Sequence, residues 1–324
     1  MANILKTDDA MESALALLES GQIVAIPTET VYGLAGDATS GEAVARIFEA
    51  KGRPRFNPLI AHIAGMAMAR RIALFDPLSI RLAEAFWPGP LTLVLPLAPG
   101  HGVHPLVTAG LDTIALRMPQ GFGATLIGRL GRPLAAPSAN TSGRITSTTA
   151  EAVAADLGDR IPLIVDGGPT PVGLESTILR VEGGTVRLLR PGGIAAELIE
   201  PVVHSSLLRG SSEGIEAPGM LASHYAPTAA VRANASDVRP GEALLAFGPT
   251  APDLAESAVA MLNLSPSGNL SEAAVNLFSF LQTLDRSGAA TIAVAPIPNV
   301  GLGEAINDRI GRAAAPRGDT RAEP

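Results

Sequence analysis

Residues 23–38 read IVAIPTETVYGLAGDA, a short β-branched run that stops at a proline and continues into a polar segment punctuated by glycine. Val and Ile favour strands, and proline has no N–H for a central strand, so the stretch predicts a buried strand over 23–26 that enters a loop at Pro27. A helical pattern begins after the N-cap candidates at 39–40 and ends at Gly-Arg-Pro, 52–54. This order of elements is typical of an α/β domain.

Strand-like and helix-like runs alternate in the same way to about residue 200, which predicts an α/β block with a mixed sheet. We expect further strands over 59–63, 91–95, 113–116, 134–136 and 163–165, a hairpin made of 177–181 and 186–189, and helices over 80–86, 124–130 and 150–157.

The composition changes near residue 205 to turn formers without a period, and this predicts a linker over 205–228. The catalytic part is then expected over 1–204. Residues 229–324 are expected to form a second, smaller α/β domain, with strands at 243–247 and 291–295 and helices at 254–262, 271–284 and 305–315.

Composition excludes several classes of protein. With 47% hydrophobic and 17% charged residues, the 324-residue chain can bury a core and is neither disordered nor fibrous. The absence of cysteine excludes disulfide scaffolds, thiolate nucleophiles, cysteine-ligated zinc and iron–sulfur clusters. No apolar run is long enough to span a membrane, and acids replace the basic flank of a signal peptide near the N-terminus, so we expect a cytoplasmic protein without membrane contact.

The standard nucleotide-binding motifs are absent. Neither Gly121-Phe122-Gly123 nor Gly301-Leu302-Gly303 completes G-x-G-x-x-G, and neither of the two lysines, Lys6 and Lys51, lies in a P-loop. The stretch 210–214 matches G-x-S-x-G, but it lies in the predicted linker without the strand that a nucleophile elbow needs. Any site for an anion must be local, because the net charge is −7.

Polar loops recur directly before or after the expected strands, and in an open α/β sheet such loops gather at the strand ends where ligands bind. They read PTETVYGLAGDA (27–38), KGRPRFNPLIAH (51–62), TIALRMP (113–119), APSANTSG (136–143), ESTILR (175–180) and RPGG (190–193). They offer hydroxyls and amides for hydrogen bonds, and the cations Lys51, Arg53, Arg117 and Arg190 for a polyanion. A nucleotide together with a small carboxylate would use both kinds of group.

Taken singly, each of these groups also has a structural interpretation. The 28–30 stretch could form only turns and caps, Lys51 and Arg53 could favour a helix C-terminus through its dipole, and Ser138 and Asn140 could form an ordinary turn. These interpretations together explain poorly why polar clusters recur at strand ends.

Six separated motifs, in order, resemble the long, two-domain Sua5 form of the YrdC/Sua5 family of threonylcarbamoyl-AMP synthases. The motifs are PTETVYGL, the K-x-R-P of KGRPRFNPL, the S-x-N of PSANTSG, ESTI and RPGG, with HYAP (224–227) in the linker. AINDRIGRAA (305–314) resembles the closing segment of the family's second domain, whereas MLAS (220–223) replaces a more basic stretch. The resemblance implies a YrdC-like open twisted mixed sheet with helices, followed by a smaller Rossmann-like α/β domain.

The resemblance also implies an activity. Members of the family condense L-threonine, bicarbonate or CO2, and ATP into L-threonylcarbamoyladenylate and pyrophosphate, a nucleotidyl transfer that feeds the N6-threonylcarbamoyl modification of adenosine 37 in tRNA. The product is expected to pass to the tRNA threonylcarbamoyl-transferase machinery.

By resemblance, two sets of residues form the site. Threonine would be held by Thr30, His62, Arg117, Ser138 and Ser176, with Arg117 gripping its carboxylate. ATP would be held by Lys51, Arg53, Asn57, Thr113, Asn140, Thr148 and Arg190, with Tyr225 folding over it from the linker. Lys51 and Arg53 would be the catalytic cations, and Mg2+ would be held through the ATP phosphates and not by protein side chains.

Two rival functions stay open at this point. One is an RNA-binding module, against which the acidic net charge speaks. The other is an enzyme that shares the first domain but uses carbamoyl phosphate. The presence of a second domain and of HYAP in this chain argues against that alternative.

Overall fold

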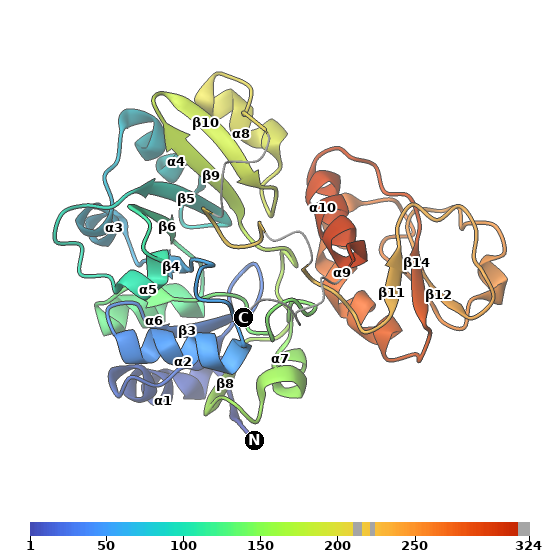
Figure 1. Cartoon of the computed structure of the whole chain (residues 1–324), viewed down its shortest axis with the longest axis horizontal. Helices are drawn as coiled ribbons and strands as arrows, with labels where there is room; N and C mark the ends of the chain where they lie inside the picture. Colours follow the sequence, from blue (N-terminus) through green and yellow to red (C-terminus); the bar gives the residue numbers. More distant parts are fainter. Residues whose placement is uncertain (210–215, 221–223, 317–324) are drawn as a thin grey trace, which may run out of the picture. The chain divides into compact units, whose positions relative to one another are not determined.

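The chain forms two units, each with its own sheet (Figure 1). The computed structural model describes residues 1–209, 216–220 and 224–316. The first unit contains Met1–Ser142 and Thr146–Met220, and the second contains Gly143–Ile145 and Leu221–Pro324. This division lies at Met220, inside the segment predicted as a linker, and Gly143–Ile145 join the second unit because Arg144 bridges to Ala226.

The first unit is built on a ten-stranded mixed sheet in the order β1-β8-β2-β3-β7-β4-β6-β5-β9-β10. Parallel pairs are β1 with β8, β2 with β8, β4 with β6 and β5 with β9, and the other neighbours are antiparallel. The strands are β1 (Asn3–Lys6), β2 (Val24–Ile26), β3 (Gly33–Asp37), β4 (Ile60–His62), β5 (Leu91–Pro96), β6 (Thr113–Arg117), β7 (Leu134–Ala135), β8 (Leu163–Asp166), β9 (Thr177–Glu182) and β10 (Thr185–Arg190). The mixed α/β fold predicted for this part is confirmed.

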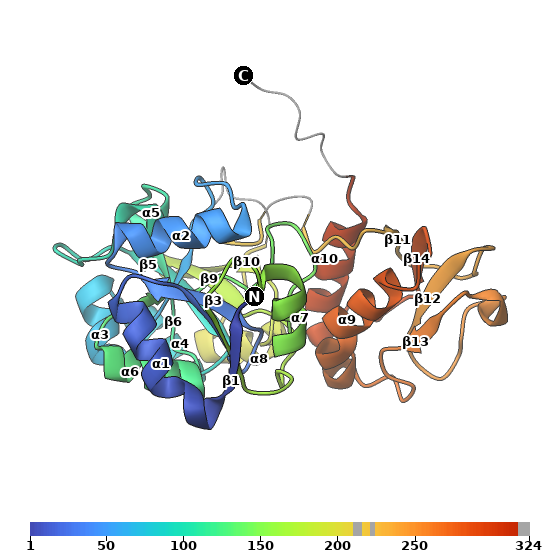
Figure 2. The same cartoon turned by 90° about the horizontal axis from the view of Figure 1, so that it is seen from below.

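Helices cover both faces of this sheet. Figure 2 shows α2 and α5 on one side of it and α1, α3 and α6 on the other. The helices are α1 (Thr7–Glu19), α2 (Gly41–Lys51), α3 (Met66–Ile72), α4 (Pro77–Phe86), α5 (Pro105–Thr108), α6 (Phe122–Leu130), α7 (Ala150–Leu157) and α8 (Ala196–Val203). The apolar core between the layers includes Leu34, Ile47 and Leu82, which are fully buried.

Local sequence explains the ends of the elements nearest to the polar loops. Helix α2 begins after Ser40, whose side chain accepts a hydrogen bond from the Ala43 N–H, and it ends at Gly52, whose φ of 59° suits a residue without a Cβ. The β9–β10 hairpin turns through Gly183 and Gly184, both with positive φ, as a two-residue hairpin loop requires. Both features agree with the sequence prediction.

The loop predicted over 27–38 is wrong in its second half, because Gly33–Asp37 form the fully buried strand β3. Glycine has a low strand propensity, which hides this strand in the sequence. Gly36 is required by close packing, since a Cβ there would lie 3.1 Å from Ile47 Cδ1 and 3.3 Å from the Ala43 carbonyl oxygen.

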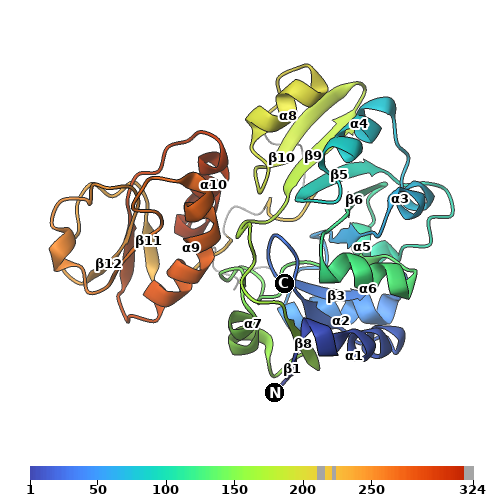
Figure 3. The same cartoon turned by 180° about the vertical axis from the view of Figure 1, so that it is seen from behind.

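The second unit is a four-stranded parallel sheet in the order β11-β14-β12-β13. Its elements are β11 (Ala230–Arg232), β12 (Glu242–Ala246), the 3-10 turn η1 (Ala255–Ser257), β13 (Met261–Asn263), α9 (Leu270–Asp285), β14 (Thr291–Val294) and α10 (Leu302–Ala314). Helices α9 and α10 lie side by side on one face of the sheet (Figure 3). A smaller Rossmann-like α/β domain was predicted, and this part of the fold prediction is confirmed.

The helix predicted over 254–262 is wrong. Leu254 has a φ of 59°, the 3-10 turn ends at Ser257, and Met261–Asn263 pair with β12 as strand β13. The apolar residues that suggested a helical face, Leu254 and Met261 among them, are exposed. Pairing with β12 thus overrides helical propensity here. Among the described helices of both units, none combines the length and apolarity needed to cross a membrane.

Candidate functional site

Three neighbouring strands bring part of the predicted threonine set together. His62 ends β4 and lies opposite Arg117, which ends β6, and Arg117 in turn lies opposite Thr92 of β5. Residues opposite each other in register point to the same face of a sheet. The Thr92 hydroxyl is 2.7 Å from that of Ser176, so Ser176 joins the same cluster.

Arg117 is paired with a residue outside the predicted sets. Its Nη2 donates to Oε1 of Glu29 at 2.7 Å, and both side chains are less than 10% exposed. The other oxygen of Glu29, Oε2, accepts a hydrogen bond from the Gln120 N–H at 3.0 Å. A buried charge is stable only when it is paired and hydrogen-bonded, and Glu29 supplies both for Arg117.

Two buried polar atoms of this cluster have no hydrogen-bond partner among the described residues: Arg117 Nε and His62 Nδ1. Burial holds the pKa of His62 well below its ordinary value, and the Arg117 cation lowers it further. His62 is therefore neutral near pH 7. Native proteins rarely leave buried polar atoms unpartnered, so this pair on adjacent strands makes the cluster a candidate ligand site.

Backbone hydrogen bonds tie the polar loops of the first unit to one another. The Tyr32 N–H donates to the Ser147 carbonyl, and the Ala139 N–H donates to the Tyr32 carbonyl at 2.7 Å. The Val172 N–H donates to the Glu29 carbonyl. Thr28 Oγ1 lies 2.9 Å from Thr30 Oγ1 and donates to the Val31 carbonyl, so the turn role considered for 28–30 is present, and it leaves Thr30 fully buried.

Lys51 is the last residue of α2 and is 1% exposed. Its Nζ donates to the main-chain carbonyls of Ser138 and Asn140, two residues of the S-x-N motif. Burial lowers the pKa of Lys51 well below its ordinary value, and the nearby Arg53 cation lowers it further. A phosphate at this point would offset the repulsion between the two cations.

Arg53 fixes a tight turn rather than pointing into solvent. The Asn57 N–H donates to the Pro54 carbonyl, and Arg53 closes this turn through its donors to the Asn57 carbonyl, Asn57 Oδ1 and the Pro58 carbonyl. The other amide atom of Asn57, Nδ2, is buried and has no partner among the described residues. Like Arg117 Nε, it is a donor available to a ligand.

Arg190, at the end of β10, lies beside the threonine set because Nη2 donates to the Ser176 carbonyl at 2.9 Å. The sheet face that carries His62, Thr92 and Arg117 continues into an apolar patch of Ile60, Val94, Ala115 and Ile178, which packs against Ala217. Arg190 Nη1 also donates to the Pro218 carbonyl. Residues 216–220, predicted as part of the linker, thus pack onto the first unit.

Two other predicted nucleotide residues are Thr113 and Thr148. Thr113 begins β6 and points to the same face as Arg117, about 13 Å away along the strand. Thr148 is buried, and its carbonyl accepts from the Thr170 N–H.

Tyr225 belongs to the second unit, and its ring is 1% exposed there. The ring centroid lies 5.6 Å from that of Phe278, and the Arg309 guanidinium carbon lies 5.2 Å from the Tyr225 centroid. The role of Tyr225 at a nucleotide stays a prediction. The 210–214 motif, residues 221–223 of MLAS and the end of the second domain beyond 316 lie outside the described residues.

Within 1–209, 216–220 and 224–316, no group of three or more His, Asp or Glu side chains is placed to hold a metal ion. His101 and His104 each accept a backbone N–H two residues ahead through Nδ1. The donor set around Lys51 and Arg117 is cationic and suits anionic oxygens rather than a metal. A Mg2+ ion would have to take its ligands mainly from phosphate oxygens and water.

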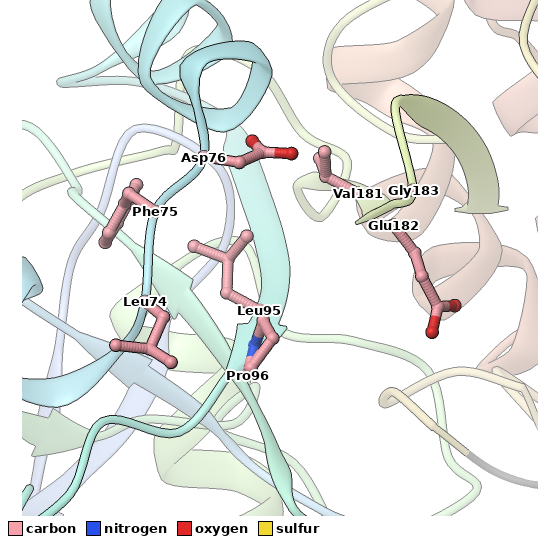
Figure 4. A pocket seen from close by; sticks show the side chains of 8 residues that line it. All are labelled: Leu74, Phe75, Asp76, Leu95, Pro96, Val181, Glu182 and Gly183. Carbon is pink, nitrogen blue, oxygen red and sulfur yellow. The ribbon is translucent and has the colours of Figure 1, made fainter.

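A pocket of about 300 Å³ lies elsewhere in the first unit and contains none of the predicted site residues. It is lined by Leu74, Phe75, Asp76, Leu95, Pro96, Val181, Glu182 and Gly183. In Figure 4 the Asp76 carboxylate points toward Val181, whereas the Glu182 side chain points away from Asp76. Asp76 caps α4 by accepting from the Ser79 N–H, so its carboxylate already has a structural role.

Sequence reasoning missed Glu29 and Thr92. Glu29 lies inside the PTET stretch next to the predicted ligand Thr30, but no local signal in the sequence pairs it with Arg117. Thr92 lies in the apolar strand LTLVLP, where only the strand register reveals that it faces Arg117.

Comparisons with known proteins cover both parts of the chain. Residues 16–192 match the family described as "Telomere recombination", and residues 194–315 match the family described as "Threonylcarbamoyl-AMP synthase, C-terminal domain". The threonylcarbamoyl-AMP synthase of Bacillus subtilis is 40% identical, over 96% of this chain and 94% of its own. The protein of that name from Pyrococcus abyssi is also 40% identical, over 94% of each chain.

A solved structure is similar along nearly the whole chain. The crystal structure of P. abyssi Sua5 complexed with L-threonine superposes with a TM-score of 0.87 at 37% identity. The match covers 97% of this chain and 98% of that one.

Proposed function

Because the chain belongs to the YrdC/Sua5 family of threonylcarbamoyl-AMP synthases, we propose that it condenses L-threonine, bicarbonate or CO2, and ATP into threonylcarbamoyl-AMP and pyrophosphate. The observation that carries this proposal is the cluster at the ends of β4 and β6. There, a neutral histidine and a paired arginine each keep one buried atom available to a ligand. Such a site suits a small carboxylate with further hydrogen-bonding groups.

Threonine is proposed to bind at this cluster. The Arg117 Nε donor would take one oxygen of the carboxylate, and the hydroxyls of Thr30 and Ser176 together with His62 would orient the rest of the molecule. Ser138 would contribute a further hydrogen bond from its loop, where its main-chain carbonyl accepts from Lys51 Nζ. A hydrogen bond to the threonine hydroxyl would reject valine strongly, whereas a pocket for the methyl group would reject serine only weakly.

ATP is proposed to bind along Lys51, Arg53 and Asn57, with Thr113, Asn140, Thr148 and Arg190 completing the set and Tyr225 folding over it from the linker. In the reaction, the threonine nitrogen bonds to the carbon of CO2, or of bicarbonate with loss of water, and gives up a proton to form a carbamate. A carbamate oxygen then attacks the α-phosphorus, and the bond from that phosphorus to the bridging oxygen of pyrophosphate breaks. Lys51 and Arg53 would stabilise the negative charge that develops on the phosphates. Mg2+, bound with ATP, would supply further charge neutralisation.

The product is proposed to serve tRNA threonylcarbamoylation through a separate transferase. The net charge of −7 gives no support to tight binding of tRNA by bulk electrostatics.

The test is pyrophosphate release from ATP with Mg2+ and bicarbonate, in the presence of L-threonine, L-serine or no amino acid. The proposal predicts release that requires both L-threonine and bicarbonate. Release that is independent of threonine would contradict it.

A further inference from the structure

We propose that Glu29 is a positioning residue for the substrate carboxylate: its hydrogen bond to Arg117 Nη2 fixes the guanidinium and leaves the buried Nε–H for a bound amino acid. This inference rests on the proposed function, because it names the residue that orients the proposed threonine-binding arginine.

The Glu29 carboxylate is itself held in place. Its Oε2 accepts from the Gln120 N–H at 3.0 Å, and its main-chain carbonyl accepts from the Val172 N–H at 3.0 Å. Gln120 follows Arg117 by three residues, so Glu29 joins the loop after β2 to the loop after β6. The position of Arg117 is therefore set by both its strand and the Glu29 side chain.

The pairing is made through one oxygen and one nitrogen. A carboxylate can take an arginine through two parallel hydrogen bonds, but here the second oxygen of Glu29 is used by Gln120 N–H. Arg117 has five N–H donors, and its Nε donor is buried without an acceptor among the described residues. The geometry keeps that donor available while the arginine stays paired.

Charge balance gives the pairing a second role. The side chains of Arg117 and Glu29 are 4% and 8% exposed, so neither charge is well solvated. The two charges of the pair cancel, so these two groups add no net charge to the site, and His62 beside them is neutral. A zwitterionic amino acid then enters a site of matching net charge, and Arg117 need not be desolvated again when the ligand binds.

The test is Glu29→Gln, which keeps the volume and one acceptor for Arg117 but places an NH2 group against the Gln120 N–H. Glu12→Gln is the matched control, because Glu12 forms an exposed ion pair with Arg129 in the same unit. We expect the KM for threonine to rise about tenfold or more in Glu29→Gln, with the KM for ATP changed less than about twofold. Glu12→Gln should leave both KM values unchanged. The KM of Glu29→Asp for threonine should lie between the values of wild type and Glu29→Gln.

A KM for threonine in Glu29→Gln within about twofold of wild type would overturn the inference. So would a rise of both KM values in parallel with a fall in melting temperature, because that pattern indicates a purely structural ion pair. If Glu29→Gln does not fold, the KM values of Glu29→Asp for threonine and ATP are compared with those of wild type instead. If the wild-type protein releases no pyrophosphate, the proposed function fails, and threonine affinity measured by calorimetry in the same variants decides the inference separately.

Discussion

His62 makes the stability of the first unit sensitive to acid in a way that one substitution should remove. Burial and the Arg117 cation hold its pKa well below the ordinary value, so the folded protein keeps the neutral imidazole while the unfolded chain takes up a proton near its ordinary pKa of about 6.5. The unfolded state therefore binds more protons below that pH. The free energy of unfolding is therefore unaffected by His62 above about pH 6.5 and decreases as the pH falls below that value.

The magnitude follows from the same linkage. When the histidine takes up a proton only in the unfolded chain, that protonation costs about 0.1 kcal/mol of stability at pH 7.5 and about 1.4 kcal/mol at pH 5.5. For a unit of this size that difference corresponds to about 3–6 °C in melting temperature. His62→Gln should lose this part of the pH dependence.

The assay is differential scanning calorimetry of wild type, His62→Gln and His204→Gln at pH 7.5 and 5.5. His204 is exposed, so its substitution controls for the loss of a histidine as such. The melting temperature of His62→Gln should fall less between the two pH values than that of wild type, whereas His204→Gln should follow wild type. Equal decreases in wild type and His62→Gln would refute the assignment of a neutral, buried His62.

Two further pairs of substitutions test other parts of the structure. Lys51→Met should lower pyrophosphate release about 100-fold or more, because the phosphates lose a buried cation. The control, Lys6→Met, removes the exposed partner of Asp166 and should leave release unchanged. Equal activities of the two variants would contradict the proposed nucleotide site. Gly36→Ala should destabilise the protein by about 1–3 kcal/mol through contact with Ile47, as urea unfolding would measure, and an unchanged midpoint would contradict the packing of β3. Gly128→Ala, an exposed helical position with no heavy atom closer than 3.9 Å to the added Cβ, should instead stabilise by about 0.5–1 kcal/mol.

Elements with a strong pattern could be predicted from the sequence, and elements formed by tertiary contacts could not. Helix α2 has an N-cap serine, amphipathic spacing and a C-terminal glycine, and these local signals suffice to predict it. Strand β3 has two glycines, and β1 is an exposed edge strand without alternation, so both depend on pairing with neighbours that the sequence does not reveal. Helix α5 has only four residues and gives no periodic signal.

The same distinction applies to the site. Lys51 stood out because only two lysines are present, and the loop motifs placed His62 and Arg117 at strand ends. The partner of Arg117 could not be predicted, because Glu29 lies 88 positions away and reaches Arg117 only through the fold. For the same reason, the packing of Tyr225 against Phe278 and Arg309 was not foreseen from HYAP.

The most direct test of the central claim is the mass of the nucleotide product formed from ATP, L-threonine and 13C-labelled bicarbonate. The proposed reaction predicts an adenylate that contains both threonine and one labelled carbon, formed together with pyrophosphate. An adenylate of threonine without the labelled carbon, or no adenylate from folded protein that binds ATP, would contradict the proposed synthase activity.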